Sequence, residues 1–189
     1  MIALWPPPVV PWLALLSGAV RSFAGDMRFV IDAHEALLRE TLALARESHR
    51  NGDQPFGALL AIDGGVVLTA SNTVISERDP TRHAELNLVS RASRTLPREA
   101  LRTATLYAST EPCAMCAGAI CHARIPRVVY GCSGQALRDL ISGGRAVPCR
   151  EILQRPPRHS IEVLGPLLED EGLALHRHLD WWASRREPR

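Results

Sequence analysis

The sequence predicts a three-layer α/β/α domain with a central mixed five-stranded sheet. Two observations lead to this class: a hairpin pattern early in the chain, and an alternation of helical and strand-like segments after it. A hairpin gives antiparallel pairing, whereas strands separated by helices pair in parallel, so both occur in one sheet. The length of 189 residues and an apolar content of 46% are those of one domain with a hydrophobic core.

Residues 1–26 form an apolar, proline-rich extension that differs from the rest of the chain. Its first half contains four prolines, which break any helix there. The apolar run over 12–20 is too short to span a bilayer, so we expect no membrane partner. A signal peptide is an alternative, because residues 22–24 resemble a cleavage site, but no positively charged region precedes the run. We expect the natural start at Met27 and a single domain over residues 27–189.

The first half of that domain reads as a helix followed by a hairpin. Asp32 and Glu35 resemble a capping box, and an apolar helical stripe continues from them to a stop near Asn51. Residues 56–62 are apolar enough for a buried strand. The Asp-Gly-Gly sequence that follows is a hairpin turn signal, and residues 66–70 form the returning strand.

The second half alternates helices and strands. Asp-Pro-Thr at 79–81 ends a polar loop, and Pro112 is typical of a helix start. Glycine and proline pairs make the region after Gly131 rich in loops. The expected elements are a helix over 82–94, a strand over 103–109, a helix over 112–123, a strand over 127–130, a short helix over 135–141, a strand over 160–164 and a final helix over 167–182.

The net charge gives no argument for nucleic-acid binding by itself, and the cysteine content argues against a disulfide-linked protein. The net charge is only +2 and the arginines are scattered, whereas a dedicated nucleic-acid-binding protein shows a clustered basic face. Five cysteines, an odd number, with one C-x-x-C pair do not resemble a disulfide framework. We therefore expect a reducing, cytoplasmic location, with the close cysteine pair used as metal ligands.

Three side chains in two short segments have the character of a zinc site. His83 lies at the start of a predicted helix, and Cys113 and Cys116 lie where a strand turns into a helix. Cysteines three residues apart in a first helical turn project from one face, where the helix dipole stabilises thiolates. Two thiolates and one imidazole leave one position of a tetrahedral zinc open, as in catalytic sites. We predict Zn2+ as the cofactor, held by these three residues.

Glu85 follows His83 by two residues and is the predicted catalytic residue. On a helix, side chains at that spacing diverge by roughly 200°, so Glu85 is not expected to be a further ligand. It would reach the water and the substrate from one side. A carboxylate there can take a proton from metal-activated water, deliver it to a ring nitrogen, and then protonate the departing amine.

Each segment alone also has an ordinary explanation. A single C-x-x-C pair is often structural zinc or plain helix packing, and a lone H-x-E pattern carries little information. Together, in this order and with Pro112 before the first cysteine, they match the zinc deaminase signature H-x-E…P-C-x-x-C. The sequence therefore predicts a hydrolytic deaminase, an aminohydrolase. A non-enzymatic, zinc-stabilised interaction module is the competing class.

The stretch from Pro55 to Cys132 resembles the cytidine deaminase-like superfamily, in the branch of guanine deaminases and tRNA-specific adenosine deaminases. The matching pieces are PFGALLAIDGGVV, SNTV, DPTRHAELNLV and LYASTEPCAMCAGAICHARIPRVVYG. The resemblance implies the superfamily fold, a homodimer and a base-binding pocket. Asn72 matches a base-binding asparagine of this branch, although a turn-forming residue after a strand is the alternative. The implied substrate-binding residues are Asn72, Phe56, Gly57, Ala58, Ala84 and Pro112.

The motifs favour a small purine of the guanine type over the alternatives. Phe56 and the N-x-V pattern are more similar to guanine deaminases, whereas tRNA enzymes tend to carry Val or Ile at position 56. The region after Gly131 matches neither group closely. An adenosine in tRNA is the main alternative substrate, and a cytosine or cytidine is another. Five arginines offer a basic surface for RNA or, as we favour, are ordinary solvated side chains: Arg124, Arg127, Arg138, Arg145 and Arg150. Trp181 and Trp182 either stack on a base or pack the last helix onto the core.

Overall fold

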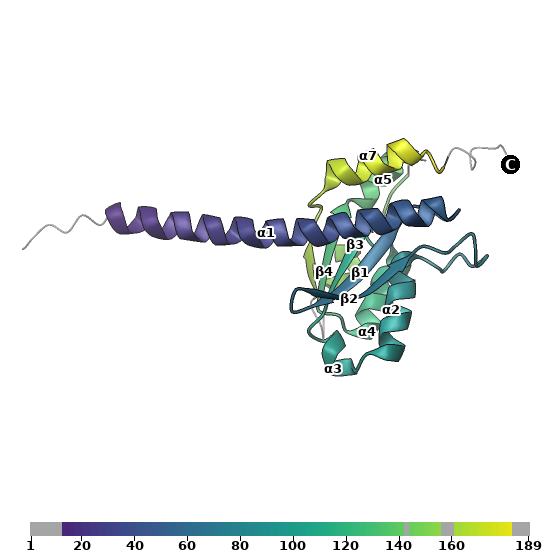
Figure 1. Ribbon diagram of the computed structural model, residues 1–189, viewed down its shortest axis with the longest axis horizontal. Helices are drawn as coiled ribbons and strands as arrows, with labels where there is room; N and C mark the ends of the chain where they lie inside the picture. The colour runs from purple at the N-terminus through teal and green to yellow at the C-terminus, as the bar shows by residue number, and fades with distance from the viewer. Residues whose placement is uncertain (1–12, 142–143, 156–160, 183–189) are drawn as a thin grey trace, which may run out of the picture. The chain divides into compact units, whose positions relative to one another are not determined.

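The computed structural model of the protein describes residues 13–141, 144–155 and 161–182. The chain divides into two compact units, Met1–His34 and Glu35–Arg189, and helix α1 (Leu13–Arg50) runs through the boundary (Figure 1). The expected helix start at Asp32 is therefore wrong, because α1 begins 19 residues earlier. The last proline of the extension is Pro11, and no later residue there prevents a helix from forming. The natural start at Met27 stays a prediction.

The second unit contains a mixed five-stranded sheet, as predicted. Its order is β2-β1-β3-β4-β5, with β1 antiparallel to β2 and β3, and with β3, β4 and β5 parallel. The turn between the first two strands holds Asp63 and Gly64 at positive φ, as a tight hairpin requires. The strands are β1 (Gly57–Ile62), β2 (Gly65–Ser71), β3 (Thr105–Thr110), β4 (Arg127–Cys132) and β5 (Glu162–Leu164).

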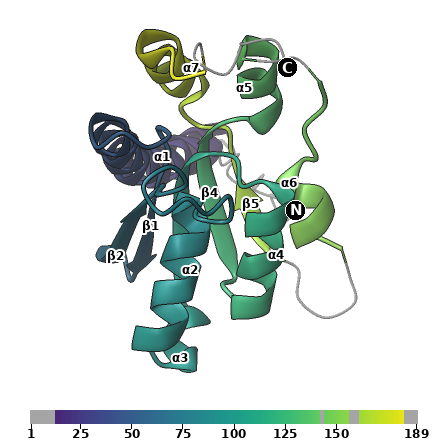
Figure 2. The same cartoon turned by 90° about the vertical axis from the view of Figure 1, so that its right-hand side faces the viewer.

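Helices cover both faces of this sheet, which confirms the three layers (Figure 2). The part of α1 from Glu35 packs on one face with the chain around α7 (Glu169–Leu179). The other face is covered by α2 (Ala84–Thr95), α4 (Ala114–Ala123) and α6 (Cys149–Leu153), while α3 (Arg98–Leu101) follows α2 and α5 (Gly134–Ile141) packs beside α7. The sequence patterns did not predict α3 and α6, which are only four and five residues long.

Alternation along the strands divides the core into two clusters. Leu59, Tyr107 and Val129 point to the face covered by α1, where they meet Leu38 and Leu42. Their neighbours along each strand point to the opposite face and pack against α2 and α4. Because strand side chains alternate with a period of two, each central strand is apolar on both faces.

Gly57 at the start of β1 allows α1 to approach the sheet closely. A Cβ atom added there would lie 2.4 Å from the carbonyl oxygen of Thr41 and 2.8 Å from the backbone nitrogen of Ala45. We expect Gly57→Ala to lower the free energy of unfolding by about 2 kcal/mol, because the backbone of α1 must shift. Urea denaturation measures the change. Gly118→Ala in α4 is the matched control, since a Cβ there meets nothing within 4 Å; equal midpoints for the two variants would contradict the prediction.

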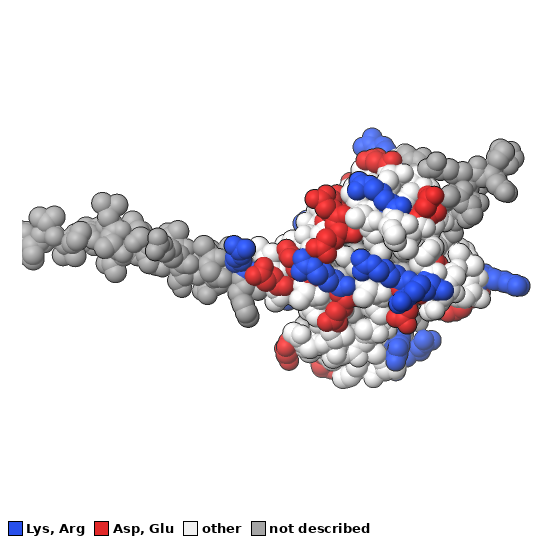
Figure 3. Space-filling model, turned by 45° about the horizontal axis from the view of Figure 1, so that its top comes forward, with Lys and Arg blue, Asp and Glu red and all other residues white. Residues whose placement is uncertain are grey.

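The surface around α1 and α7 carries both signs of charge. Arg39 on α1 forms ion pairs with Glu35 at 3.0 Å and with Glu171 at 2.8 Å, and Figure 3 shows positive and negative side chains interspersed on this face. Over the part of the chain that is described, no helix combines the length and the apolar character needed to cross a membrane.

Candidate active site

The candidate site forms where the starts of two neighbouring helices meet. His83 is the N-cap of α2, and Cys113 is the N-cap of α4. Both residues have extended backbone angles, with ψ of 151° and 171°. The expectation that His83 and Cys113 lie inside helices is therefore wrong. The angle of roughly 200° between the side chains of His83 and Glu85, which assumes that both residues are helical, does not apply. The direction of the His83 and Cys113 side chains is therefore set by the turns before the helices and not by helical periodicity.

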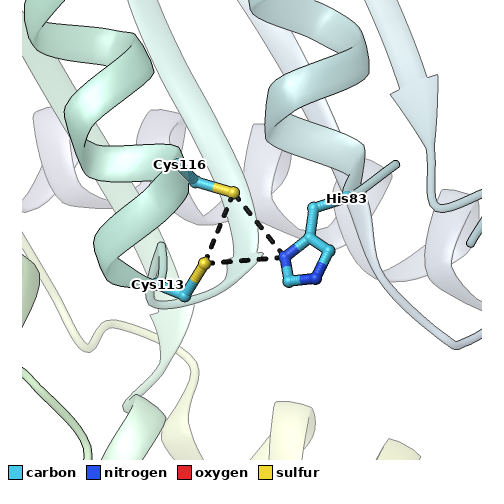
Figure 4. A group of neighbouring side chains, drawn as sticks. All are labelled: His83, Cys113 and Cys116. Carbon is cyan, nitrogen blue, oxygen red and sulfur yellow. Dashed lines mark hydrogen bonds between the residues drawn. The ribbon is translucent and has the colours of Figure 1, made fainter. Parts of the chain in front are cut away.

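The three predicted ligands form a small triangle (Figure 4). The Sγ atom of Cys113 lies 3.6 Å from that of Cys116 and 3.6 Å from Nδ1 of His83, and the third side is 3.7 Å. Tetrahedral zinc with its usual bond lengths to sulfur and nitrogen separates such ligand atoms by about 3.5–3.8 Å. The donor set and its geometry therefore fit zinc, with Nδ1 as the histidine ligand atom. Among the described residues, no other cluster of this kind appears.

Glu85 lies beside this triangle with its carboxylate buried. Its Oε2 atom is 3.7 Å from the Sγ atom of Cys116, and the residue is only 7% exposed. Burial raises the pKa of Glu85 to about 7, although its own backbone N–H partly opposes the shift. A carboxyl group with such a pKa can both accept and release a proton near neutral pH.

The two ligand thiols influence each other. Hydrogen bonds from Cys116 and His83 lower the pKa of Cys113 to about 4. The neighbouring Cys113 thiolate and burial raise the pKa of Cys116. The Cys113 thiolate is thus available before a metal binds, whereas the proton on the Cys116 thiol must leave when the metal binds.

A pocket of about 400 Å³ opens over the site. Its lining includes His83, Glu85 and Cys113, together with the predicted substrate contacts Phe56 and Pro112. This volume lies in the range of small-molecule sites. The structure therefore brings the predicted catalytic group, two of the predicted ligands and two of the predicted substrate contacts to one cavity.

The other four predicted substrate contacts lie outside the residues that line this pocket. Ala58 and Ala84 are fully buried in the core, and Gly57 donates its backbone N–H to Ser109 Oγ at 3.2 Å. Asn72 is 1% exposed, and its Oδ1 atom accepts the N–H of Val74 at 3.0 Å. Its Nδ2 atom has no hydrogen-bond partner among the described residues. A buried donor of this kind is suited to a ligand acceptor, so its base-binding role stays a prediction.

Sequence reasoning missed a polar group behind the pocket, the buried imidazole of His176 on α7. Trp181 donates its indole N–H to Nδ1 of this histidine at 3.1 Å, so Nε2 carries the proton and faces Thr110 Oγ1 at 3.3 Å. The imidazole also packs against the ring of Phe56, with 5.3 Å between centroids. Both Thr110 and Phe56 line the pocket. The contact requires residues more than 60 positions apart, so no local pattern could indicate it.

The same environment predicts a pH-dependent stability. Burial lowers the pKa of His176 to about 4, below its ordinary value of 6.5. Between these values the unfolded chain binds a proton that the folded protein does not, so stability falls as pH drops from 6.5 to 4. The His176 contribution to this loss is about 3 kcal/mol. Urea unfolding at pH 7.5 and pH 4.5 should show a smaller pH effect in His176→Gln than in the wild type. His178→Gln, an exposed change on the same helix, is the control and should match the wild type.

The fold and the triangle of ligands define a zinc hydrolase of the deaminase class. The family profile for the cytidine and deoxycytidylate deaminase zinc-binding region matches residues 31–132. This match covers more than half of the chain, which therefore belongs to that family. The protein is accordingly a zinc-dependent aminohydrolase, as the signature predicted.

Relatives of different substrate specificity resemble the chain. A probable cytosine deaminase from Schizosaccharomyces pombe is 35% identical over 147 residues, which are 75% of this chain and 89% of the relative. A solved structure from work on A-to-I editing by tRNA:A34 deaminases is 32% identical, with a TM-score of 0.62, and the match covers 75% of this chain and 99% of that one. Guanine deaminase from Bacillus subtilis is 35% identical, with a TM-score of 0.52, and covers 57% and 69% of the two chains. The chain thus shares its family with relatives that are named for three different substrates.

Proposed function

We propose that the protein deaminates a nucleobase or nucleoside by hydrolysis, with a small purine of the guanine type as the favoured substrate. The observation that carries the proposal is the buried carboxylate of Glu85 beside the His-Cys-Cys triangle, in the lining of a pocket of about 400 Å³. Phe56 in the pocket lining and the likeness to the guanine deaminase of Bacillus subtilis support the purine.

His83, Cys113 and Cys116 would hold the metal, and Glu85 would carry the protons. A zinc ion with an open position supplies a Lewis acid that lowers the pKa of bound water towards 7. Glu85 would accept one proton from the attacking water and transfer it to the ring nitrogen next to the carbon under attack. It would then take the second proton from the hydroxyl group on that carbon and deliver it to the amine, so that ammonia leaves as the C–N bond breaks and a carbonyl group forms. Phe56 and Pro112 line the pocket and would hold the base against the site. Asn72 is the predicted donor to the base through its Nδ2 atom, which is unpartnered among the described residues and lies outside the residues that line the pocket.

An adenosine in tRNA is the second candidate substrate. Arg138 and Arg145, both exposed, belong to the pocket lining, where they could meet phosphate groups. The 32% identical structure from the work on tRNA deaminases also supports this candidate. The likeness to the Schizosaccharomyces pombe relative supports a cytosine-type substrate as a third candidate.

An ammonia-release screen separates these candidates. The substrates are guanine, guanosine, cytosine, adenine, adenosine and an anticodon stem-loop RNA, each at low and high salt. Guanine turnover that does not change with salt concentration supports a small purine as the substrate. Turnover of the RNA alone, decreasing steeply with salt, supports the second candidate. A zinc-loaded protein that releases no ammonia from any of them would favour a non-enzymatic zinc module.

We also propose a homodimer, which the resemblance to the superfamily implies. Light scattering on the purified full chain measures the molar mass. We expect twice the mass of one chain, and the mass of a single chain would contradict the proposal.

A further inference from the structure

One stretch of chain provides a large part of the pocket lining. We call it the pocket wall and define it as α5 together with residues 144–149. Leu137, Ile141 and Val147 provide apolar lining from this wall. It follows β4, in the region whose sequence resembles neither subfamily closely. Whatever holds the pocket wall in place therefore affects which substrate fits.

A single carboxylate binds both ends of the pocket wall. Glu111 Oε2 accepts the backbone N–H of Gly134 at 3.0 Å, and Glu111 Oε1 accepts the backbone N–H of Cys149 at 2.8 Å. Gly134 begins α5 and Cys149 begins α6, so both N–H groups belong to helix starts. A negative charge at such a position gains from both hydrogen bonding and the helix dipoles.

The side chain of Gln135 forms two further hydrogen bonds within the pocket wall, between α5 and residues 144–146. Gln135 Nε2 donates to the carbonyl oxygen of Gly144 at 3.0 Å, and its Oε1 atom accepts the N–H of Ala146 at 2.9 Å. This amide holds residues 144–146 against α5. The pocket wall is thus joined at its ends by Glu111 and across its centre by Gln135.

Glu111 is also directly connected to the metal site. It is followed by Pro112 and then by the ligand Cys113, and its own N–H donates to the carbonyl oxygen of Cys132 at 2.8 Å. The segment that presents a zinc ligand therefore also carries the group that binds the pocket wall. We infer that Glu111 is a positioning residue, whose carboxylate fixes the pocket wall relative to Cys113 and thereby sets substrate affinity. This inference rests on the proposed function.

The test is Glu111→Gln in the zinc-loaded full chain. Glutamine has the same size but only one acceptor oxygen, so one of the two backbone N–H groups loses its partner. With guanine, or the best substrate of the ammonia screen, we expect KM to rise about 10-fold or more while kcat stays within about twofold. Hydrogen exchange of the wall amides should become roughly 10- to 100-fold faster, the range expected for a lost bond to a charged acceptor. Zinc content should stay the same.

Glu171→Gln is the matched control, since that exposed carboxylate pairs with Arg39 and does not line the pocket. An unchanged KM with unchanged exchange in Glu111→Gln overturns the inference, and so does a fall in kcat at constant KM. If Glu111→Gln cannot be obtained with zinc, Gln135→Ala opens the same pocket wall away from the ligands. Gln135→Ala must then raise both KM and the exchange rate, and no change in either overturns the inference. If the wild type releases no ammonia, the proposed function fails, and the exchange measurement on the two variants still decides whether Glu111 holds the pocket wall.

Discussion

Glu85→Gln should reduce kcat by at least about 1,000-fold while the protein keeps its zinc. The amide has nearly the same size as the carboxyl group but cannot carry a proton, and a positioned general acid–base group typically contributes 100- to 10,000-fold. Two proton transfers depend on this one side chain in the proposed reaction, which places the effect in the upper part of that range. Ammonia release under saturating substrate measures kcat, and metal analysis measures zinc per chain.

Glu99→Gln is the matched control, because Glu99 is an exposed carboxylate on α3. It should retain wild-type turnover and zinc. Wild-type activity in Glu85→Gln would refute the proposed role of Glu85. Loss of zinc in that variant would instead show that the carboxylate, 3.7 Å from Cys116 Sγ, supports the metal ligands.

Cys116→Ser should abolish stoichiometric zinc binding and, with it, all turnover. Cys116 is fully buried within the ligand triangle, and a serine hydroxyl at its position is a poor zinc ligand. Because metal binding stabilises only the folded state, the variant should also lose the stabilisation that zinc gives the wild type. That amounts to about 4 kcal/mol when free zinc is 1,000 times its dissociation constant.

Cys121→Ser in the same helix is the control, since Cys121 lies outside the ligand triangle. Metal analysis and thermal unfolding with and without a chelator give the two readouts. We expect the chelator to lower the unfolding temperature of the wild type and of Cys121→Ser, but not that of Cys116→Ser. A Cys116→Ser protein that still binds one zinc per chain would rule out the ligand set.

The structure shows why the metal site was accessible to sequence reasoning. His83 and Glu85 are two residues apart, and Cys113 and Cys116 are three apart, so each half of the site is a local unit at a helix start. Runs of apolar residues likewise located the central strands, because a strand buried on both faces is apolar along its whole length. The backbone conformation of His83 and Cys113 was predicted incorrectly, because both are N-cap residues and an N-cap residue is not yet helical.

Local sequence patterns did not predict the start of the first helix or the two shortest helices. A capping box at Asp32 suggested a helix start, yet α1 passes through it from Leu13. Such a box is compatible with a helix interior whenever the preceding residues can also be helical. The short helices α3 and α6 were missed because four or five residues are too few to show a period.

The sequence by itself determined the reaction class of this protein, through four residues whose chemistry depends only on short spacing. Tertiary structure alone decided how the pocket is built. Glu111 meets the N–H of Cys149 across 38 residues, and His176 meets Thr110 across 66. Contacts of this kind depend on how β3, α6 and α7 pack together, and their partners share no periodicity along the chain. For that reason the metal chemistry can be inferred from a motif, whereas the surroundings that select a substrate require the folded structure.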